Sequence, residues 1–400
     1  MAAVPAVRTR ITSLFRCRYP LLCPGMSWIS SPELVAAVSN AGERPSFWDG
    51  LGRPRPDQRL LRAEWWNGAG AHGGDVGGVG ILATGPLTAA ETRDSIRRIR
   101  SLTDMPFGVG ITLLMPRSRE NADAAIDERV PIVNVSLGRA DGISDRVRDY
   151  GGVILATVTN ARHAEAAIES GADALMLTGH EAAAHGGDVT SLVLIPAISN
   201  RYPDVPIVAA GGFADGRGLA AAIALGADGV AMGSRFAVTT ESPLAIRTKV
   251  AISSPTSTET ETLYGKNFDG IPARVLRTET SSRLMGRPAP FPSVAYRAFG
   301  AARRMGIPLH RVLPGLLMQW DKMYTIAQFG AATEYLMRAT VEGDHEGGVQ
   351  FIGQCQGLIE DIPTVDDLVQ RIMREAADAS SLSYETFSDG EQNGACRNVM

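Results

Sequence analysis

The 400-residue sequence lacks the marks of several protein classes. Its four cysteines, Cys17, Cys23, Cys355 and Cys396, are far apart and form no CxxC pair, which argues against a disulfide scaffold or a zinc ribbon. No apolar run approaches the roughly 20 residues that a membrane-spanning helix needs. Residues 1–26 contain arginines but no apolar stretch long enough for a signal peptide. We therefore expect a cytoplasmic protein with no membrane partner.

The charge is nearly balanced. The formal net charge is −4, and no basic cluster with interleaved aromatic residues occurs, so we expect no nucleic-acid partner. Because 44% of the residues are hydrophobic, the chain can bury a large core. Its length suits one large domain with an appended lobe.

Eight short apolar runs recur along the first 232 residues, most of them separated by helix-like stretches. Runs that are continuously apolar, rather than alternating, are typical of strands buried on both faces of a sheet. Eight alternating strands and helices predict an α/β fold, a (β/α)₈ TIM barrel over residues 8–254. The runs are 20–26, 77–84, 106–114, 131–137, 152–158, 173–177, 206–210 and 228–232.

Two of the intervening helices have clear sequence signals. In Leu87–Leu102, Thr88 is a predicted N-cap and Glu91 completes a capping box. A second helix is predicted at Ala161–Ser170.

The rest of the chain departs from this alternation. Residues 43–76 are rich in Gly, Pro, Arg and Trp and form an atypical insertion with no helix or strand period. Residues 255–350 are predicted to form a helical lobe over the barrel mouth, with apolar helical runs at Val294–Met305 and Pro314–Ala339. Two further segments are expected at the end of the chain: a C-terminal return segment at 351–377 and a polar, disordered tail at 378–400.

Glycine turns follow the seventh and eighth predicted strands, at Gly211-Gly212 and Gly233-Ser234. In barrel enzymes the loops after these two strands commonly bind phosphate through backbone N–H groups. A Cβ at the glycines would block the close approach of the phosphate, and Ser234 could add a hydroxyl group. The alternative is that these are plain tight turns.

A histidine-containing loop, GHEAAAHGG, follows the sixth predicted strand. His180 and His185 are five residues apart, about 140° around a helix, so they do not form a zinc-binding HExxH pair, and we expect no metal. At the C-terminal face of a barrel, His185 is a candidate acid/base residue, with a structural role as the alternative that position alone leaves open. His180 is predicted to be structural.

Several segments together resemble the nitronate monooxygenase family, formerly called 2-nitropropane dioxygenase, which is related to flavin-dependent enoyl-acyl-carrier-protein reductases. The most specific is DVPIVAAGGFADGRGLAAAIALGADGVAMGSRF at 204–236. Supporting segments are PELVAAVSNAG, DMPFGVGITLL, GHEAAAHGG and GQCQGLIEDIPTVDDLV. The resemblance implies an FMN cofactor.

The resemblance also implies roles for single residues. His185 matches the catalytic histidine of the family. Cofactor-binding positions are matched by Met26, Gly110, Thr178, Ala183, Gly211, Gly212, Ala231, Met232, Gly233 and Ser234.

This sequence departs from the family pattern at several points. Gly110 stands where an asparagine is usual, Ala183-Ala184 replace two glycines, and Gly186 replaces an arginine.

Joining Gly42 directly to Gly77, without the insertion at 43–76, would give the family-like sequence NAGGVGIL. We therefore hypothesise that the insertion is either a retained intron or a genuine addition, which transcript sequencing would decide.

The resemblance implies oxidation of alkyl nitronates or nitroalkanes by O₂, giving a carbonyl compound and nitrite. One alternative is an NAD(P)H-dependent flavin reductase of enoyl thioesters or quinones on the same scaffold. A flavin-free isomerase or epimerase of phosphorylated sugars and a non-catalytic flavin-binding protein also stay open. We expect a small-molecule substrate and O₂ as partners, with a homodimer as the assembly to test.

Overall fold

A computed structural model describes residues 7–42, 77–115, 117–183, 185–287, 290–304 and 320–395, so the insertion at 43–76 lies outside the described residues. Eight parallel strands close into a barrel in which each pairs with the next and β8 pairs with β1. Each predicted apolar run overlaps one strand, and the predicted (β/α)₈ barrel is confirmed. The strands are β1 (Leu21–Cys23), β2 (Val79–Ala83), β3 (Gly108–Thr112), β4 (Ile132–Ser136), β5 (Val153–Val158), β6 (Ala174–Thr178), β7 (Ile207–Ala210) and β8 (Gly229–Ala231).

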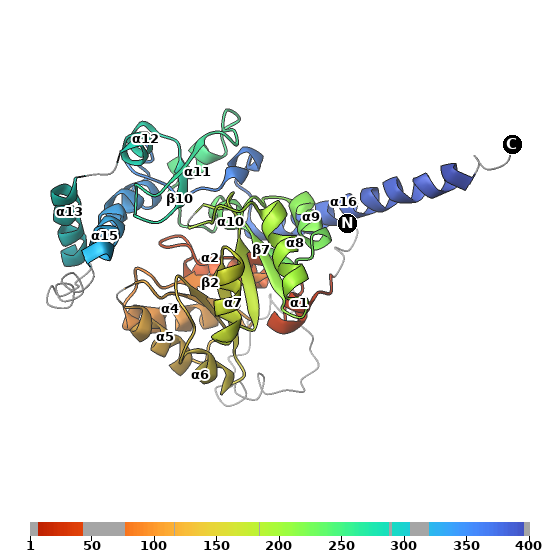
Figure 1. Cartoon of the computed structure of the whole chain (residues 1–400), viewed down its shortest axis with the longest axis horizontal. Helices are drawn as coiled ribbons and strands as arrows, with labels where there is room; N and C mark the ends of the chain where they lie inside the picture. Colours follow the sequence, from red (N-terminus) through yellow and green to blue (C-terminus); the bar gives the residue numbers. More distant parts are fainter. Residues whose placement is uncertain are drawn as a thin grey trace, which may run out of the picture.

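Helices surround the barrel on the outside (Figure 1). α4 begins with the predicted capping box, because Thr88 accepts a hydrogen bond from the Glu91 backbone and the Glu91 carboxylate accepts one from Thr88 N at 2.7 Å. The helices between the strands are α2 (Pro32–Asn40), α4 (Ala89–Leu102), α5 (Ser118–Asp127), α6 (Ser144–Arg148), α7 (Ala161–Glu169), α8 (Ser191–Arg201) and α9 (Gly216–Ala224).

The inside of the barrel is filled by every second strand residue, because side chains alternate across a strand. Leu22, Ile81 and Ile132 belong to this inner cluster. Ile11 and Phe15 of α1 (Arg10–Phe15) join the same cluster and are fully buried. The C-terminal ends of the strands therefore form the face available to a ligand.

The region after the barrel forms a lobe above the barrel mouth (Figure 1). The two predicted helical runs correspond to α13 and α15, which pack against each other. An antiparallel hairpin of β9 and β10 was not predicted, because its strands are only four residues long. The elements are α11 (Ile246–Ile252), β9 (Thr262–Gly265), β10 (Ala273–Leu276), α12 (Glu279–Gly286), α13 (Phe291–Arg304) and α15 (Trp320–Thr340).

The chain returns to the barrel through a long helix, α16 (Val365–Ala395). Its first half packs beside α9 and α2 through Leu368 and Ile372, and a Cβ on Gly216 would lie 2.2 Å from Ile372 O. The helix then continues through residues 378–395, where we predicted a disordered tail, and projects away from the body (Figure 1). A helix already nucleated by packing extends at little cost, which corrects that expectation. None of the described helices is long and apolar enough to cross a membrane.

Candidate active site

A cavity of about 980 Å³ opens at the C-terminal ends of the strands, between the barrel and the lobe. Its volume lies at the upper end of the roughly 300–1,000 Å³ typical of small-molecule sites. The barrel contributes strand ends and loops, and the lobe contributes residues of the β9–β10 hairpin, α15 and the segment 350–355.

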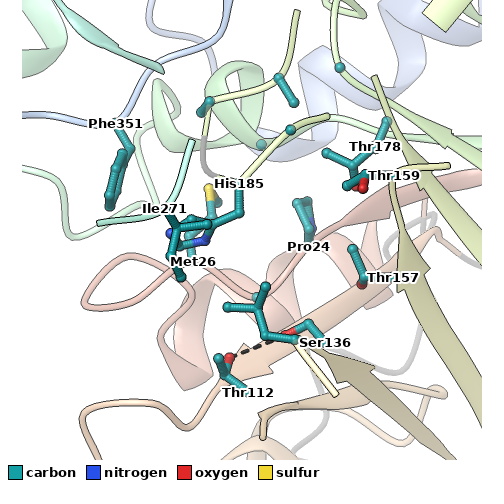
Figure 2. Close-up of a pocket in the computed structure, with 18 of the residues that line it drawn as sticks. Pro24, Met26, Thr112, Ser136, Thr157, Thr159, Thr178, His185, Ile271 and Phe351 are labelled. Atoms are coloured by element: carbon teal, nitrogen blue, oxygen red, sulfur yellow. Dashed lines mark hydrogen bonds between the residues drawn. The ribbon is translucent and has the colours of Figure 1, made fainter. Parts of the chain in front are cut away.

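The two sides of the cavity differ in chemistry (Figure 2). Hydroxyl side chains near the ends of β3 to β6 form one side, and Ser136 Oγ donates to Thr112 Oγ1 at 3.2 Å. On the other side Ile271 and Phe351 of the lobe lie near Met26 and His185. A ligand here therefore meets hydrogen-bonding groups on one side and apolar groups on the other.

The glycines after β7 and β8 fit a phosphate. Gly211 and Gly212 have φ values of 98° and 89°, in the left-handed region that favours glycine. Within the described part of the chain, the backbone N–H groups of Gly212, Gly233 and Ser234 donate no hydrogen bond. The Ser234 hydroxyl accepts from Gly353 N at 2.9 Å and also contacts the Cys355 side chain. These donors suit the phosphate of the FMN that the resemblance implies.

Hydrogen bonds at Gly179 and Glu181 hold the first residues of the loop that contains His180 and His185. The Glu181 carboxylate accepts hydrogen bonds from Ser191 N and Ser191 Oγ at the beginning of α8. The backbone oxygen of Glu181 accepts from Gln354 N at 2.9 Å, and Gly179 N donates to Ala210 O. Glu181 therefore holds the loop between α8 and the segment that returns from the lobe.

His185 projects into the cavity from a strained backbone position, with φ of 53° and its side chain 19% exposed. Its Nε2 lies 3.0 Å from Oδ2 of Asp269, a carboxylate only 2% exposed. Asp269 Oδ1 accepts from Ile271 N at 3.2 Å. An ionised carboxylate only accepts, so in the neutral imidazole Nε2 carries the proton and Nδ1 has the lone pair. His185 can thus accept a proton at Nδ1.

Sequence reasoning missed Asp269. The residue lies in the turn between β9 and β10, 84 positions from His185. Its Asp-Gly dipeptide is a turn signal, and Gly270 has φ of 87°. That signal could have placed a turn here, but no local pattern links this turn to the histidine.

His180 makes contacts of a structural kind, as predicted. Its Nδ1 lies 3.1 Å from Gly187 O, and its ring packs 4.3 Å from the Tyr264 ring. The buried guanidinium of Arg274 donates to His180 O at 3.0 Å, and burial lowers the pKa of Arg274. Arg274 N also donates to Ala183 O. The β9–β10 hairpin therefore clamps the histidine loop.

Two residues proposed as cofactor contacts, Gly110 and Met232, do not line the cavity. Met232 is fully buried between the barrel and the surrounding helices. Its neighbour Ala231 points into the barrel, and side chains alternate along a strand. Gly110 has an inward position but no side chain to reach the cavity. The other predicted residues line it: Met26, Thr178, Ala183, His185, Gly211, Gly212, Ala231, Gly233 and Ser234.

The chain is similar to several named proteins, over 68% to 95% of its length. A (3aS,4S,5R,7aS)-5-hydroxy-7a-methyl-1-oxo-octahydro-1H-indene-4-carboxyl-CoA dehydrogenase of Mycobacterium tuberculosis is 32% identical, covering 92% of this chain and 96% of the relative. A probable nitronate monooxygenase of Staphylococcus saprophyticus is 27% identical over 68% of this chain and 79% of its own. The solved structure of FabK from Thermotoga maritima is 30% identical, covers 95% of this chain and 99% of its own, and has a TM-score of 0.71.

The family model for nitronate monooxygenase matches residues 120–375, more than half of the chain. The matched residues include the histidine loop, both glycine turns and Asp269. The family resemblance drawn from the sequence is therefore confirmed, and the chain belongs to the nitronate monooxygenase family of flavin-dependent oxidoreductases.

Proposed function

We propose that the chain is an FMN-dependent oxidoreductase that oxidises nitroalkanes or alkyl nitronates with O₂, giving a carbonyl compound and nitrite. The observation that carries the proposal is the His185 imidazole, which faces the cavity while Asp269 fixes its other nitrogen. FMN, when bound, would accept electrons from the substrate and return them to O₂.

The protein's own groups have separate tasks in this reaction. Gly212, Gly233 and Ser234 would bind the cofactor phosphate through N–H groups that have no other acceptor in the described part of the chain. His185 would take a proton from the substrate carbon at Nδ1, and Asp269 would stabilise the imidazolium that forms. Apolar lobe residues such as Phe351 would exclude water above the substrate.

A second candidate is an FMN-dependent dehydrogenase or NAD(P)H-dependent reductase of acyl thioesters. Two observations favour it. The similarity to the CoA-ester dehydrogenase extends over 96% of that relative. The cavity also has an apolar wall of Phe329, Leu336 and Phe351, which offers more room than a small nitroalkane needs.

Anaerobic stopped-flow absorbance of the FMN-loaded protein separates these functions. Reduction of the flavin by an alkyl nitronate, with NADPH inert, would support the first proposal. We expect His185→Ala to abolish reduction by the neutral nitroalkane, whose proton must be removed, and to spare reduction by the preformed nitronate. His163→Ala is the matched control, because His163 lines the same cavity but is exposed and bonds to Thr159.

Fast flavin bleaching by NADPH with an inert nitronate would instead move the chain to the reductases and make His185 a proton donor. A colourless protein that cannot be loaded with FMN would refute both candidates. Cytoplasmic location and a homodimer stay predictions, to be checked by fractionation and by light scattering.

A further inference from the structure

One buried amide on the cavity floor has an unused acceptor. Asn134 occupies the middle of β4, is 5% exposed and lines the cavity. It points into the barrel, since Ile132 two residues earlier belongs to the inner cluster and side chains alternate. Met176, Ala210 and Ala231 face the same space without a hydrogen-bonding side chain, whereas Thr157, the register partner of Met176, carries a hydroxyl.

The hydrogen bonds of Asn134 fix which way its amide points. Nδ2 donates to Leu155 O at 2.9 Å and to Thr157 Oγ1 at 3.0 Å. A backbone carbonyl can only accept, so the NH₂ group must face Leu155. Over the described residues, Asn134 Oδ1 has no hydrogen-bond partner. Because Asn134 lines the cavity, this oxygen is free to accept a hydrogen bond from a bound ligand.

Thr157 completes the pattern. Its hydroxyl oxygen already accepts from Asn134, so the hydroxyl hydrogen is free to donate. Asn134 and Thr157 therefore offer an acceptor beside a donor. The pyrimidine edge of an oxidised isoalloxazine ring has the complementary order, with its only N–H donor, N3, between two carbonyl acceptors.

The position of β4 in the barrel agrees with this match. The closed order β1 to β8 places β4 opposite β8, which carries Gly233 and Ser234 at its end. A flavin whose phosphate bound at these two residues would extend its ring across the mouth toward β4.

We propose that Asn134 is a flavin-positioning residue, whose Oδ1 accepts the N3–H of the isoalloxazine while Thr157 donates to a neighbouring ring carbonyl. This inference rests on the proposed FMN dependence. The inference assigns recognition of the pyrimidine edge to Asn134 and predicts that this side chain binds the N3–H group of the flavin.

The test is equilibrium binding of FMN and 3-methyl-FMN to the flavin-free protein, followed by quenching of flavin fluorescence. The methyl group removes the N3–H donor. Wild type should bind 3-methyl-FMN about 10-fold more weakly than FMN, because one hydrogen bond is lost. Equal binding of the two flavins would overturn the inference and leave FMN dependence intact. Failure of wild type to bind either flavin would overturn the proposed function itself.

Variants locate the effect. In Asn134→Leu, FMN should bind about 10-fold more weakly. The methyl penalty, which is the weaker binding of 3-methyl-FMN relative to FMN, should disappear in this variant. Thr84→Val is the matched control: Thr84 is 1% exposed, donates to Gly110 O at 2.7 Å and does not line the cavity. This control should keep the full methyl penalty. A penalty that persists in Asn134→Leu would indicate simple crowding and refute the assignment.

A rescue variant shows whether weak FMN binding by Asn134→Leu reflects the lost amide or a folding defect. Gly110 is the register partner of Asn134 on β3, and a Cβ there would lie 3.3 Å from Leu82 O, so a small shift admits a side chain. Gly110→Asn in the Asn134→Leu background should restore both the FMN affinity and the methyl penalty. If Asn134→Leu does not fold, equal binding of the two flavins by wild type still overturns the inference, and Asn134→Ala takes the place of Asn134→Leu in separating a lost hydrogen bond from crowding.

Discussion

His185 Nε2 lies 3.0 Å from Asp269 Oδ2, although the two residues are 84 positions apart in the chain. The histidine belongs to the barrel and the aspartate to the lobe. The lobe therefore does more than cover the cavity, because it fixes the ring of the candidate base.

Asp269→Asn should lower kcat by roughly 10- to 100-fold on a neutral substrate and change KM little. The substitution removes the carboxylate charge and, with the amide oxygen held by Ile271 N, places an NH₂ donor against Nε2. Steady-state kinetics with α-protonated and α-deuterated nitroalkane measure this, and the isotope effect should rise as proton removal becomes slower. Asp188→Asn is the control, because Asp188 also lines the cavity but contacts Tyr264. An unchanged isotope effect and kcat would show that Asp269 has no part in proton transfer.

Gly211→Ala should lower the free energy of unfolding by about 1–2 kcal/mol and weaken FMN binding. The residue has φ of 98°, and a Cβ would lie 3.0 Å from Ala182 N. Gly142→Ala is a matched control, because Gly142 has φ of 73° with open space around the added carbon. The control should lose stability but keep its FMN affinity, as urea unfolding and flavin titration would show. Equal FMN affinity in all three proteins would refute a phosphate-binding role for the turn after β7.

The capping box of α4 predicts an acid-sensitive contribution to stability. The hydrogen bond from Thr88 N holds the pKa of Glu91 below its ordinary value. A depressed pKa stabilises the fold above the unfolded value near pH 4.3, and this contribution is lost as the pH falls through the folded pKa. Glu91→Gln should therefore be less acid-sensitive than wild type by on the order of a few tenths of a kcal/mol. Urea unfolding at pH 7 and pH 3 measures it.

Asp94→Asn, on the exposed side of the same helix, should leave the acid sensitivity due to Glu91 unchanged. Thr88→Ala should cost about 1 kcal/mol at pH 7, because it removes the cap itself. Identical acid profiles for wild type and Glu91→Gln would contradict the assigned role of the carboxylate.

The three described cysteines should be unreactive in the folded protein. Burial raises the pKa of Cys17 and Cys23 to about 12 and that of Cys355 to about 11, so each thiol stays protonated at neutral pH. In a Cys396→Ser variant, Ellman's reagent at pH 8 should titrate no thiol until denaturant is added. Rapid labelling of Cys355, which borders the cavity, would show that solvent reaches it more freely than its burial indicates.

Local signals in the sequence determined much of this protein. The eight apolar runs specified the strands because a barrel strand buried on both faces must be apolar throughout. The turns at Gly211-Gly212 and Gly233-Ser234 predicted a phosphate site, because close backbone approach favours glycine. At Gly211 and Gly212 the positive φ angles also favour glycine. The loop with His185 followed from its place after the sixth strand.

Only the tertiary structure decided how these pieces act together. Asp269 reaches His185 because the lobe folds back over the barrel mouth, and no periodicity in the sequence encodes that distance. Asn134 sits in a run predicted only as an apolar strand, and its free oxygen emerges from bonds to β5, the neighbouring strand. The helix through 378–395 extends from residues anchored on α9. Each of these features depends on contacts between segments far apart in the chain, whereas the strands and turns depend on neighbours along it.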